Sequence, residues 1–206
     1  MAYIYAASVI IILIAIYLYL KFKENKKDGK ALKNESKHAI RNIAISSILM
    51  ALAAILKVYG IMIGTDMRLA FYSIPLILAG LVCGVDYGIL AALGADLVYS
   101  AVSGYAFNIT YTIGAILWGL LGGIFRYYQA KHYKLNIIVV FIGVLIASLL
   151  ETHINLLSNL ILYGKGTTMV LMLYKYLIIV IKIPIITSLV ILLNERVVKK
   201  IFIDKK

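Results

Sequence analysis

The chain has 206 residues, of which 63% are hydrophobic, and its mean hydropathy is +0.97. Soluble domains are closer to half apolar, so these values exclude a soluble globular protein and indicate an integral membrane protein. The formal net charge is +12, but the basic residues lie in short segments between or after apolar spans. That distribution is typical of the positive-inside bias of membrane proteins, and we expect no nucleic-acid partner.

The first apolar segment covers residues 3–20 and predicts a membrane span in the lipid bilayer. A signal peptide would have basic residues before its apolar core, whereas here the basic sequence KFKENKK follows the core. We therefore expect residues 1–21 to form a retained N-terminal transmembrane anchor. The lysine-rich segment 22–41 is expected to be a cytoplasmic linker, with lipid binding by its basic residues as the alternative.

Six further apolar spans are predicted within a domain that covers residues 42–196. Their approximate limits are 42–60, 69–83, 88–104, 107–125, 135–163 and 168–195. The segments do not alternate as the strands of a membrane barrel do, so helices must cross the bilayer. The predicted fold class is an all-α integral membrane protein, a six-helix transmembrane bundle with one extra N-terminal transmembrane helix and a basic tail at 197–206.

The distribution of charge gives the orientation of these spans. With the linker inside, successive connections alternate between the two sides, and the inside segments then hold 16 of the 21 basic residues. This bias places the linker and the C-terminal tail in the cytoplasm of a multi-pass protein of the cell membrane.

Polar residues within the spans concentrate in the outer half of the predicted bundle. At 1.5 Å per residue, Lys57 lies about 24 Å from the inner surface and Lys175 about 10 Å below the outer surface. A charge that faces lipid costs about 2.5–3.5 kcal/mol. We therefore expect these groups to face a cavity that opens outward, with simple ion pairing as the alternative for each one.

Small residues form a stripe on the span at 42–60. Ala44, Ser47, Ala51 and Ala54 follow a 3-4-3 spacing, which lets another helix backbone approach closely. Ala115, Gly119 and Gly123 form a similar stripe on the span at 107–125. Such a stripe serves either packing within the chain or docking of a partner.

Several chemistries find no support in the sequence. It contains no P-loop, nucleophile elbow or HExxH motif, so we do not expect the chain to hydrolyse ATP. The three histidines have no metal-ligand spacing, and we expect no metal site. A single cysteine, Cys83, excludes an intramolecular disulfide.

Residues 41–196 resemble the S component, the substrate-binding membrane subunit, of an energy-coupling factor (ECF) vitamin transporter, and within that group the folate-specific branch. The similar segments are MRLAFYSIPLILAGLVCGVDYG, FNITYTIGAILWGLLGG and YKYLIIVIKIPIITSLVILL, with Asp96 and Pro184 matched and Lys175 in place of the usual Arg. Val85 and Ala92 depart from the pattern, and ETHINLLSNLILYG lacks the usual aromatic residue.

The resemblance implies a non-catalytic, high-affinity vitamin-binding subunit of an ATP-driven importer, which needs no cofactor and whose transported ligand is folate. Its partners would be a transmembrane coupling protein, docked on the Ala44–Ala54 stripe, and two ATPase subunits. Together with the predicted outward cavity, it gives the following candidate ligand-binding residues: Lys57, Asp66, Arg68, Asp96, Phe107, Asn108, Tyr111, Glu151, His153, Asn155 and Lys175.

The charge of the predicted cavity favours an anionic ligand. Its outer cluster contains Lys57, Arg68, Lys165 and Lys175 against Asp66 and Glu151. Such a positive excess suits folate, whose glutamate tail carries two carboxylates.

Other functions stay open. One alternative is an S component for a different vitamin or precursor, such as pantothenate, pyridoxine or hydroxymethylpyrimidine. Another is an intramembrane enzyme, for which Glu151 and His153 are the nearest acid and base; their i,i+2 spacing predicts different helix faces. A third is a structural membrane protein, which would leave the polar cluster unexplained.

Overall fold

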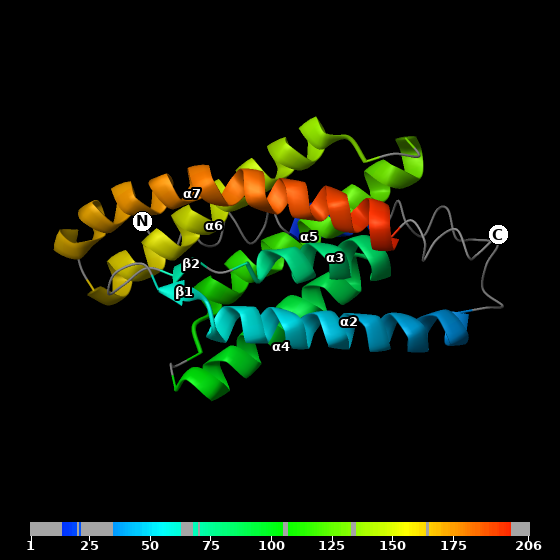
Figure 1. Ribbon diagram of the computed structural model, residues 1–206. Helices are drawn as coiled ribbons and strands as arrows, with labels where there is room; N and C mark the ends of the chain where they lie inside the picture. Colours follow the sequence, from blue (N-terminus) through cyan, green and yellow to red (C-terminus); the bar gives the residue numbers. More distant parts are fainter. Residues whose placement is uncertain are drawn as a thin grey trace.

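The computed structural model describes residues 14–19, 21, 35–62, 68–69, 71–104, 107–132, 135–163 and 165–198. Most of these residues belong to a helical bundle (Figure 1), which confirms the predicted all-α fold class. Its helices are α2 (Glu35–Val58), α3 (Ser73–Cys83), α4 (Val85–Ser103), α5 (Ile109–His132), α6 (Ile137–Tyr163) and α7 (Lys165–Leu193), and a π-helical turn, η2 (Asn194–Val198), continues α7.

In the described part of the chain, five helices are long and apolar enough to cross a membrane. They are α2, α4, α5, α6 and α7. The exposed side chains along them are mostly Ile, Leu and Val, as expected where helices face lipid tails.

The span expected at 69–83 is shorter in the structure. Helix α3 has 11 residues, so it is about 16 Å long at 1.5 Å per residue, against a hydrocarbon core of about 30 Å. It starts at Ser73 because the residues before it pair as two short strands, β1 (Ile61–Met62) and β2 (Arg68–Leu69), in an antiparallel hairpin. All its residues except Leu78 are buried, because α2, α4 and α5 pack around it.

Helices α3, α4 and α5 pack backbone against backbone through glycines. A Cβ atom on Gly80 would lie 2.2 Å from the Gly119 carbonyl oxygen, and one on Gly119 would lie 2.4 Å from that of Gly88. A Cβ atom on Gly122 would lie 2.1 Å from the Ile77 carbonyl oxygen. The Ala115–Gly123 stripe therefore serves packing within the chain.

Several helix boundaries differ from the expected ones. Helix α2 begins at Glu35, inside the segment expected to be a linker, and α5 continues to His132. The connection expected at 84–87 is a single residue, Gly84, between α3 and α4. Its φ of 110° reverses the chain at low cost only because glycine has no Cβ atom.

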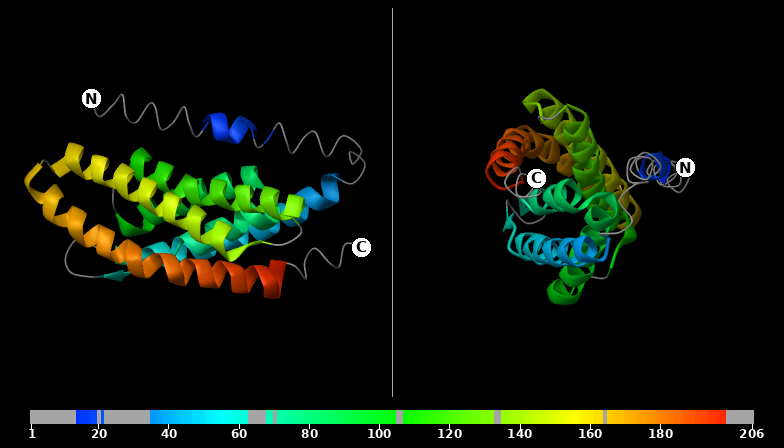
Figure 2. Two further views of the ribbon diagram at one scale, coloured as in Figure 1. Left: turned by 90° about the horizontal axis from the view of Figure 1, so that it is seen from above. Right: turned by 90° about the vertical axis from the view of Figure 1, so that its right-hand side faces the viewer.

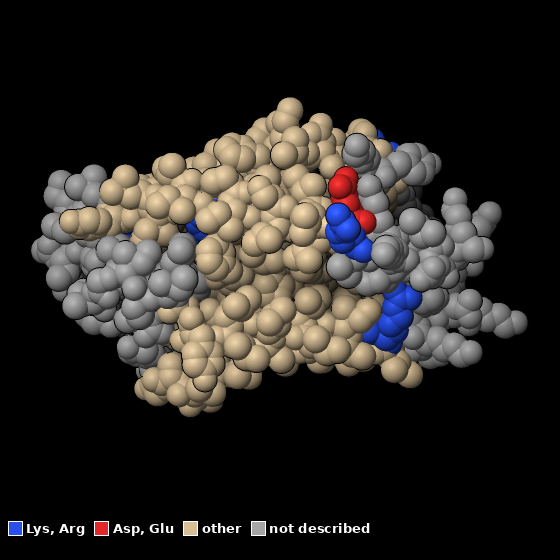
Figure 3. All heavy atoms as spheres, viewed as in Figure 1, with Lys and Arg blue, Asp and Glu red and all other residues tan. Residues whose placement is uncertain are grey.

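The connections alternate between the two ends of the bundle, as the sequence predicts. The start of α2, the end of α3, the end of α5 and the end of α7 lie toward one end of the bundle (Figure 1). The two strands, the end of α4 and the end of α6 lie toward the other end (Figure 1). On the face shown in Figure 3, charged side chains gather at the first end, which the charge bias predicts to be cytoplasmic.

The N-terminal helical turn, residues 14–19, lies beside α5 on the side of the bundle away from α7 (Figure 2). Its Ile16 and Tyr17 pack against Val85 of α4 and Leu120 of α5. The rest of the span expected at 3–20, most of the linker and residues 199–206 of the tail lie outside the described residues.

Candidate functional site

A buried ion pair joins α2 to α4. Lys57, in the last turn of α2, is bonded to Asp96 in the middle of α4, and Asp96 also accepts a hydrogen bond from the Thr112 hydroxyl group of α5. Asp96 is 3% exposed and Thr112 is fully buried. An unpaired carboxylate in such surroundings costs several kcal/mol of stability. Lys57 and Thr112 therefore both stabilise the buried Asp96 carboxylate.

Glu151 of α6 forms a second polar centre. It accepts a hydrogen bond from the Tyr72 hydroxyl group at one oxygen and from Lys182 Nζ at the other, over 3.1 Å. Tyr72 directly precedes α3, and Lys182 lies on α7. The short helix α3 thus begins deep enough in the bundle to bring a phenol group to the carboxylate.

Aromatic rings connect the two centres. Lys57 Nζ lies 4.9 Å from the centre of the Tyr72 ring and 5.2 Å from that of Tyr99. Lys182 Nζ lies 5.8 Å from the Tyr72 ring and 5.1 Å from the Trp118 ring. These are cation–π distances, and both lysines therefore share Tyr72.

We call these residues the buried network: Lys57, Tyr72, Asp96, Tyr99, Thr112, Trp118, Glu151 and Lys182. It draws on helices α2, α4, α5, α6 and α7 and on the residue before α3. Its two lysines and two carboxylates balance in charge. The arrangement can hold a polar, ring-containing molecule, because it offers ammonium donors, carboxylate acceptors and aromatic faces in an apolar bundle.

Trp118 Nε1 of the network and two buried polar atoms near it find no hydrogen-bond partner among the described residues. The two nearby atoms are the Ser73 hydroxyl oxygen and Asn155 Oδ1. A Cβ atom on Gly114 would lie 3.3 Å from Glu151 Cγ and 3.5 Å from Asn155 Oδ1, so this glycine keeps α5 close to both side chains. Buried polar atoms are normally hydrogen-bonded, which makes all three atoms candidate ligand contacts.

Asn108 and Tyr111, at the start of α5, form hydrogen bonds to α6 nearer the predicted outer end of the bundle. Asn108 precedes the first residue of α5, and its Oδ1 accepts hydrogen bonds from the Thr110 backbone N–H and hydroxyl groups at 3.0 and 2.6 Å. Its Nδ2 donates to Ser158 Oγ over 2.9 Å, and the Tyr111 hydroxyl group donates to Asn159 Oδ1 over 2.5 Å.

His153 lies away from the network. It is exposed, its Nδ1 donates to the Leu149 carbonyl oxygen over 2.7 Å, and its Nε2 accepts from the Tyr176 hydroxyl group over 3.0 Å. Glu151 is 6% exposed, so the prediction that the two residues lie on different faces is confirmed. This separation removes the acid–base pair that the intramembrane enzyme would need.

The remaining candidate residues are placed as follows. Phe107 is 46% exposed, and Lys175 is partly buried on α7. Arg68 lies in β2, but its side chain, like all of Asp66, is outside the described residues. Of the cluster expected to carry a positive excess, Lys57, Lys175 and Glu151 are described, whereas the side chains of Asp66, Arg68 and Lys165 are not. The buried network itself has equal numbers of positive and negative charges.

Sequence reasoning missed several members of the network, of which Lys182 is the most informative. A lysine inside an apolar span is costly wherever it lies, so Lys182 carries the same sequence signal as Lys57. Tyr72 and Thr112 gave no such signal, because neutral side chains of these types are common in membrane helices.

The small-residue stripe of α2 lies mostly on the surface. Ala44, Ser47 and Ala51 are exposed, next to Ile48, which is 69% exposed. Ala54 is only 3% exposed and packs within the bundle. Three of the four predicted interface residues are therefore accessible to another helix.

Within the described ranges, no group of three His, Cys, Asp or Glu side chains could hold a metal ion.

The fold and the buried network define a multi-spanning membrane protein with an internal polar site. Residues 41–193 match the family model described as "ECF transporter, substrate-specific component", and the chain belongs to this family. No curated protein matches the chain.

Family membership makes the chain a membrane-embedded, substrate-specific subunit of an ECF transporter. It associates in that role with the coupling and ATPase subunits of such a transporter. Members of the family bind the transported substrate and are not catalytic. The predicted superfamily is thus confirmed, and the folate-specific branch stays a prediction.

Proposed function

We propose that the chain captures folate or a related vitamin in an outward-opening cavity and delivers it to a coupling protein driven by two ATPases. The observation that carries this proposal is the buried network. A purely structural membrane helix would avoid the cost of Lys57, Asp96, Glu151 and Lys182, so a substrate-specific subunit that keeps all four is expected to use them.

The chemistry of the network supports a ligand with a heteroaromatic ring and carboxylates. A lysine ammonium group has three donors, so Lys57 and Lys182 can each bind a ligand oxygen in addition to the carboxylate that they already contact. The Tyr72 and Trp118 rings offer faces for stacking. Glu151 can accept a hydrogen bond from the N–H groups of a pterin ring.

We propose that the ligand contacts come from two sets of residues. Those selected from the sequence are Lys57, Asp66, Arg68, Asp96, Phe107, Asn108, Tyr111, Glu151, Asn155 and Lys175. Those added from the structure are Tyr72, Ser73, Trp118 and Lys182. His153 is omitted because it is bonded to Tyr176 on an exposed face.

The exposed part of the α2 stripe is the proposed docking surface for the coupling protein. Ala44, Ser47 and Ala51 would let a partner helix approach α2 closely. The chain itself has no nucleotide-binding motif, so the energy would come from the ATPases of the complex. In this proposal the whole subunit tilts in the membrane to release the vitamin inward.

The proposal is tested on the purified full-length chain. Small molecules that co-purify with it are identified by mass spectrometry, and binding of radiolabelled folate is measured on wild type and on Glu151→Gln and Lys182→Gln. We expect folate among the bound molecules and weaker binding by both variants. Pantothenate, pyridoxine or hydroxymethylpyrimidine in place of folate would reassign the vitamin. Unchanged binding by both variants would contradict the site.

A further inference from the structure

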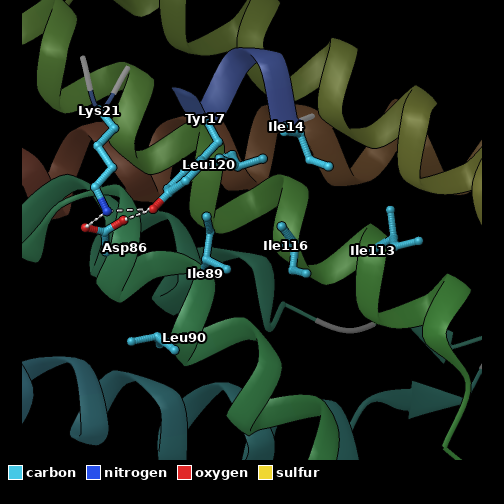
Figure 4. Close-up of a pocket in the computed structure, with 9 residues that line it drawn as sticks. All are labelled: Ile14, Tyr17, Lys21, Asp86, Ile89, Leu90, Ile113, Ile116 and Leu120. Atoms are coloured by element: carbon cyan, nitrogen blue, oxygen red, sulfur yellow. Dashed lines mark hydrogen bonds and ion pairs between the residues drawn. The ribbon is translucent and has the colours of Figure 1, made fainter. Parts of the chain in front are cut away.

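A groove of about 520 Å³ lies between the N-terminal helical turn and helices α4 and α5 (Figure 4). Six of its nine lining residues are Ile or Leu, and they come from all three elements. On α5 the groove is lined by Ile113, Ile116 and Leu120, whereas Thr112 and Trp118 of the buried network lie on another face of that helix. The groove is therefore separate from the proposed vitamin site.

One end of the groove carries a cation and an anion side by side. The Tyr17 hydroxyl group donates to Asp86 Oδ1 over 2.8 Å, and Lys21 Nζ donates to the Tyr17 hydroxyl oxygen over 2.9 Å. Lys21 Nζ also lies 3.5 Å from Asp86 Oδ2. The two charged side chains are 46% and 49% exposed, so both can contact a further molecule.

The charged end of the groove lies where the predicted topology puts the cytoplasmic boundary of the membrane. Asp86 lies in the first turn of α4, two residues after Gly84, at the end of the bundle that the charge bias predicts to be cytoplasmic. From Leu120 to Ile113 the lining of α5 runs away from this end over about 10 Å. Leu90, also in the lining, is 61% exposed. The groove thus starts near the headgroup region and continues along the hydrocarbon core.

We propose that this groove binds a zwitterionic phospholipid of the phosphatidylethanolamine type, with one acyl chain against α4 and α5. Its apolar wall suits a hydrocarbon chain, and its volume falls within the range of about 300–1,000 Å³ of ordinary ligand pockets. Lys21 donates to the lipid phosphate, and the lipid ammonium group donates to Asp86. An anionic lipid such as phosphatidylglycerol has no cation for Asp86 and meets a like charge there.

The bound lipid would hold the N-terminal helical turn, residues 14–19, against the bundle. Its acyl chain fills the space between Ile14 and Ile116, and its headgroup joins Lys21 of one element to Asp86 of the other. The extra N-terminal helix is then part of the folded protein through a lipid as well as through the contacts of Tyr17.

Native mass spectrometry of the full-length chain tests the proposal. The protein is reconstituted into vesicles of equal parts phosphatidylethanolamine and phosphatidylglycerol, extracted with mild detergent, and the retained lipids are counted. We expect one phosphatidylethanolamine per chain, preferred about tenfold, the ratio that one additional charge-assisted hydrogen bond provides. Ile116→Trp, which fills the groove, should abolish this retention, and Leu177→Trp on the exposed face of α7 should leave it unchanged.

A second variant tests the charged end of the groove. Asp86→Asn removes the anion and should shift the preference toward phosphatidylglycerol. If Ile116→Trp lowers the melting temperature, Leu90→Trp fills the groove from its exposed rim and replaces it. Equal retention of the two lipids by wild type, or wild-type retention in the folded Trp variant, would overturn the proposal. A dimer that Ile116→Trp dissociates would assign the groove to a second copy of the chain instead.

Discussion

Glu151 on α6 and Lys182 on α7 form an ion pair of 3.1 Å whose side chains are only 7% and 11% exposed. Lys182→Met would leave the Glu151 carboxylate buried with the Tyr72 hydroxyl group as its described partner. Removing one member of a buried pair costs about 3–5 kcal/mol. We expect a clear loss of stability against denaturant in detergent, partly recovered in Lys182→Met/Glu151→Gln.

Lys131→Met is the matched control for this prediction, because Lys131 is exposed at the end of α5. Equal stabilities of Lys182→Met and Lys131→Met would show that the ion pair contributes nothing to holding α6 against α7.

The second prediction concerns the charge of the ligand. Lys175→Ala and Arg68→Ala are each expected to weaken folate binding about 10–100-fold, because a hydrogen bond to a charged group contributes about 1.5–3 kcal/mol. Binding of radiolabelled folate to the purified variants measures the effect. His153→Ala, which alters an exposed contact with Tyr176, serves as the control. Wild-type affinity in both lysine and arginine variants would refute the anionic-ligand argument.

The third prediction concerns the docking surface. Ala51→Trp should prevent assembly with the coupling protein and leave vitamin binding intact, because the bulky ring keeps a partner backbone away from α2. Co-purification of the complex and binding of ligand to the isolated subunit separate the two effects. Val180→Trp, at a 70% exposed position of α7, provides the comparison. Normal assembly of Ala51→Trp would show that the stripe is not the docking surface.

The fourth prediction concerns orientation. Single cysteines replace Lys30 or Lys165 in a Cys83→Ala background, and a membrane-impermeant thiol reagent is added to intact cells. We expect labelling at position 165 only, because 16 of the 21 basic residues lie in segments predicted to be inside. Labelling at position 30 from outside would reverse the topology.

Hydropathy and charge predicted the helical bundle and its alternating connections, since both depend on composition along the chain. The length of α3 was not predictable in this way. Residues 69–83 are as apolar as a true span, and a hydropathy pattern does not distinguish a helix surrounded by helices from one surrounded by lipid. The hairpin of two-residue strands is also too short to give a periodic pattern.

The candidate site was predictable in part. Lys57, Asp96 and Glu151 could be selected because a charge within a span is costly wherever it occurs. Their partners could not, because Tyr72 meets Glu151 only through the packing of α3 against its neighbours. The exposure of His153 could not be predicted either, because it depends on how α6 is rotated about its axis in the bundle.

The glycine contacts of α3, α4 and α5 bear on how the protein changes shape. A Cβ atom would meet backbone at 2.2 Å at Gly80 and at 2.1 Å at Gly122, so these three helices interlock with no room for sliding. The polar bonds of Lys57 and Glu151, in contrast, connect this glycine-packed block to α2, α6 and α7. A polar solute can compete for bonds of that kind but not for backbone packing. We therefore expect admission of a solute to move α2, α6 or α7 against the three-helix core.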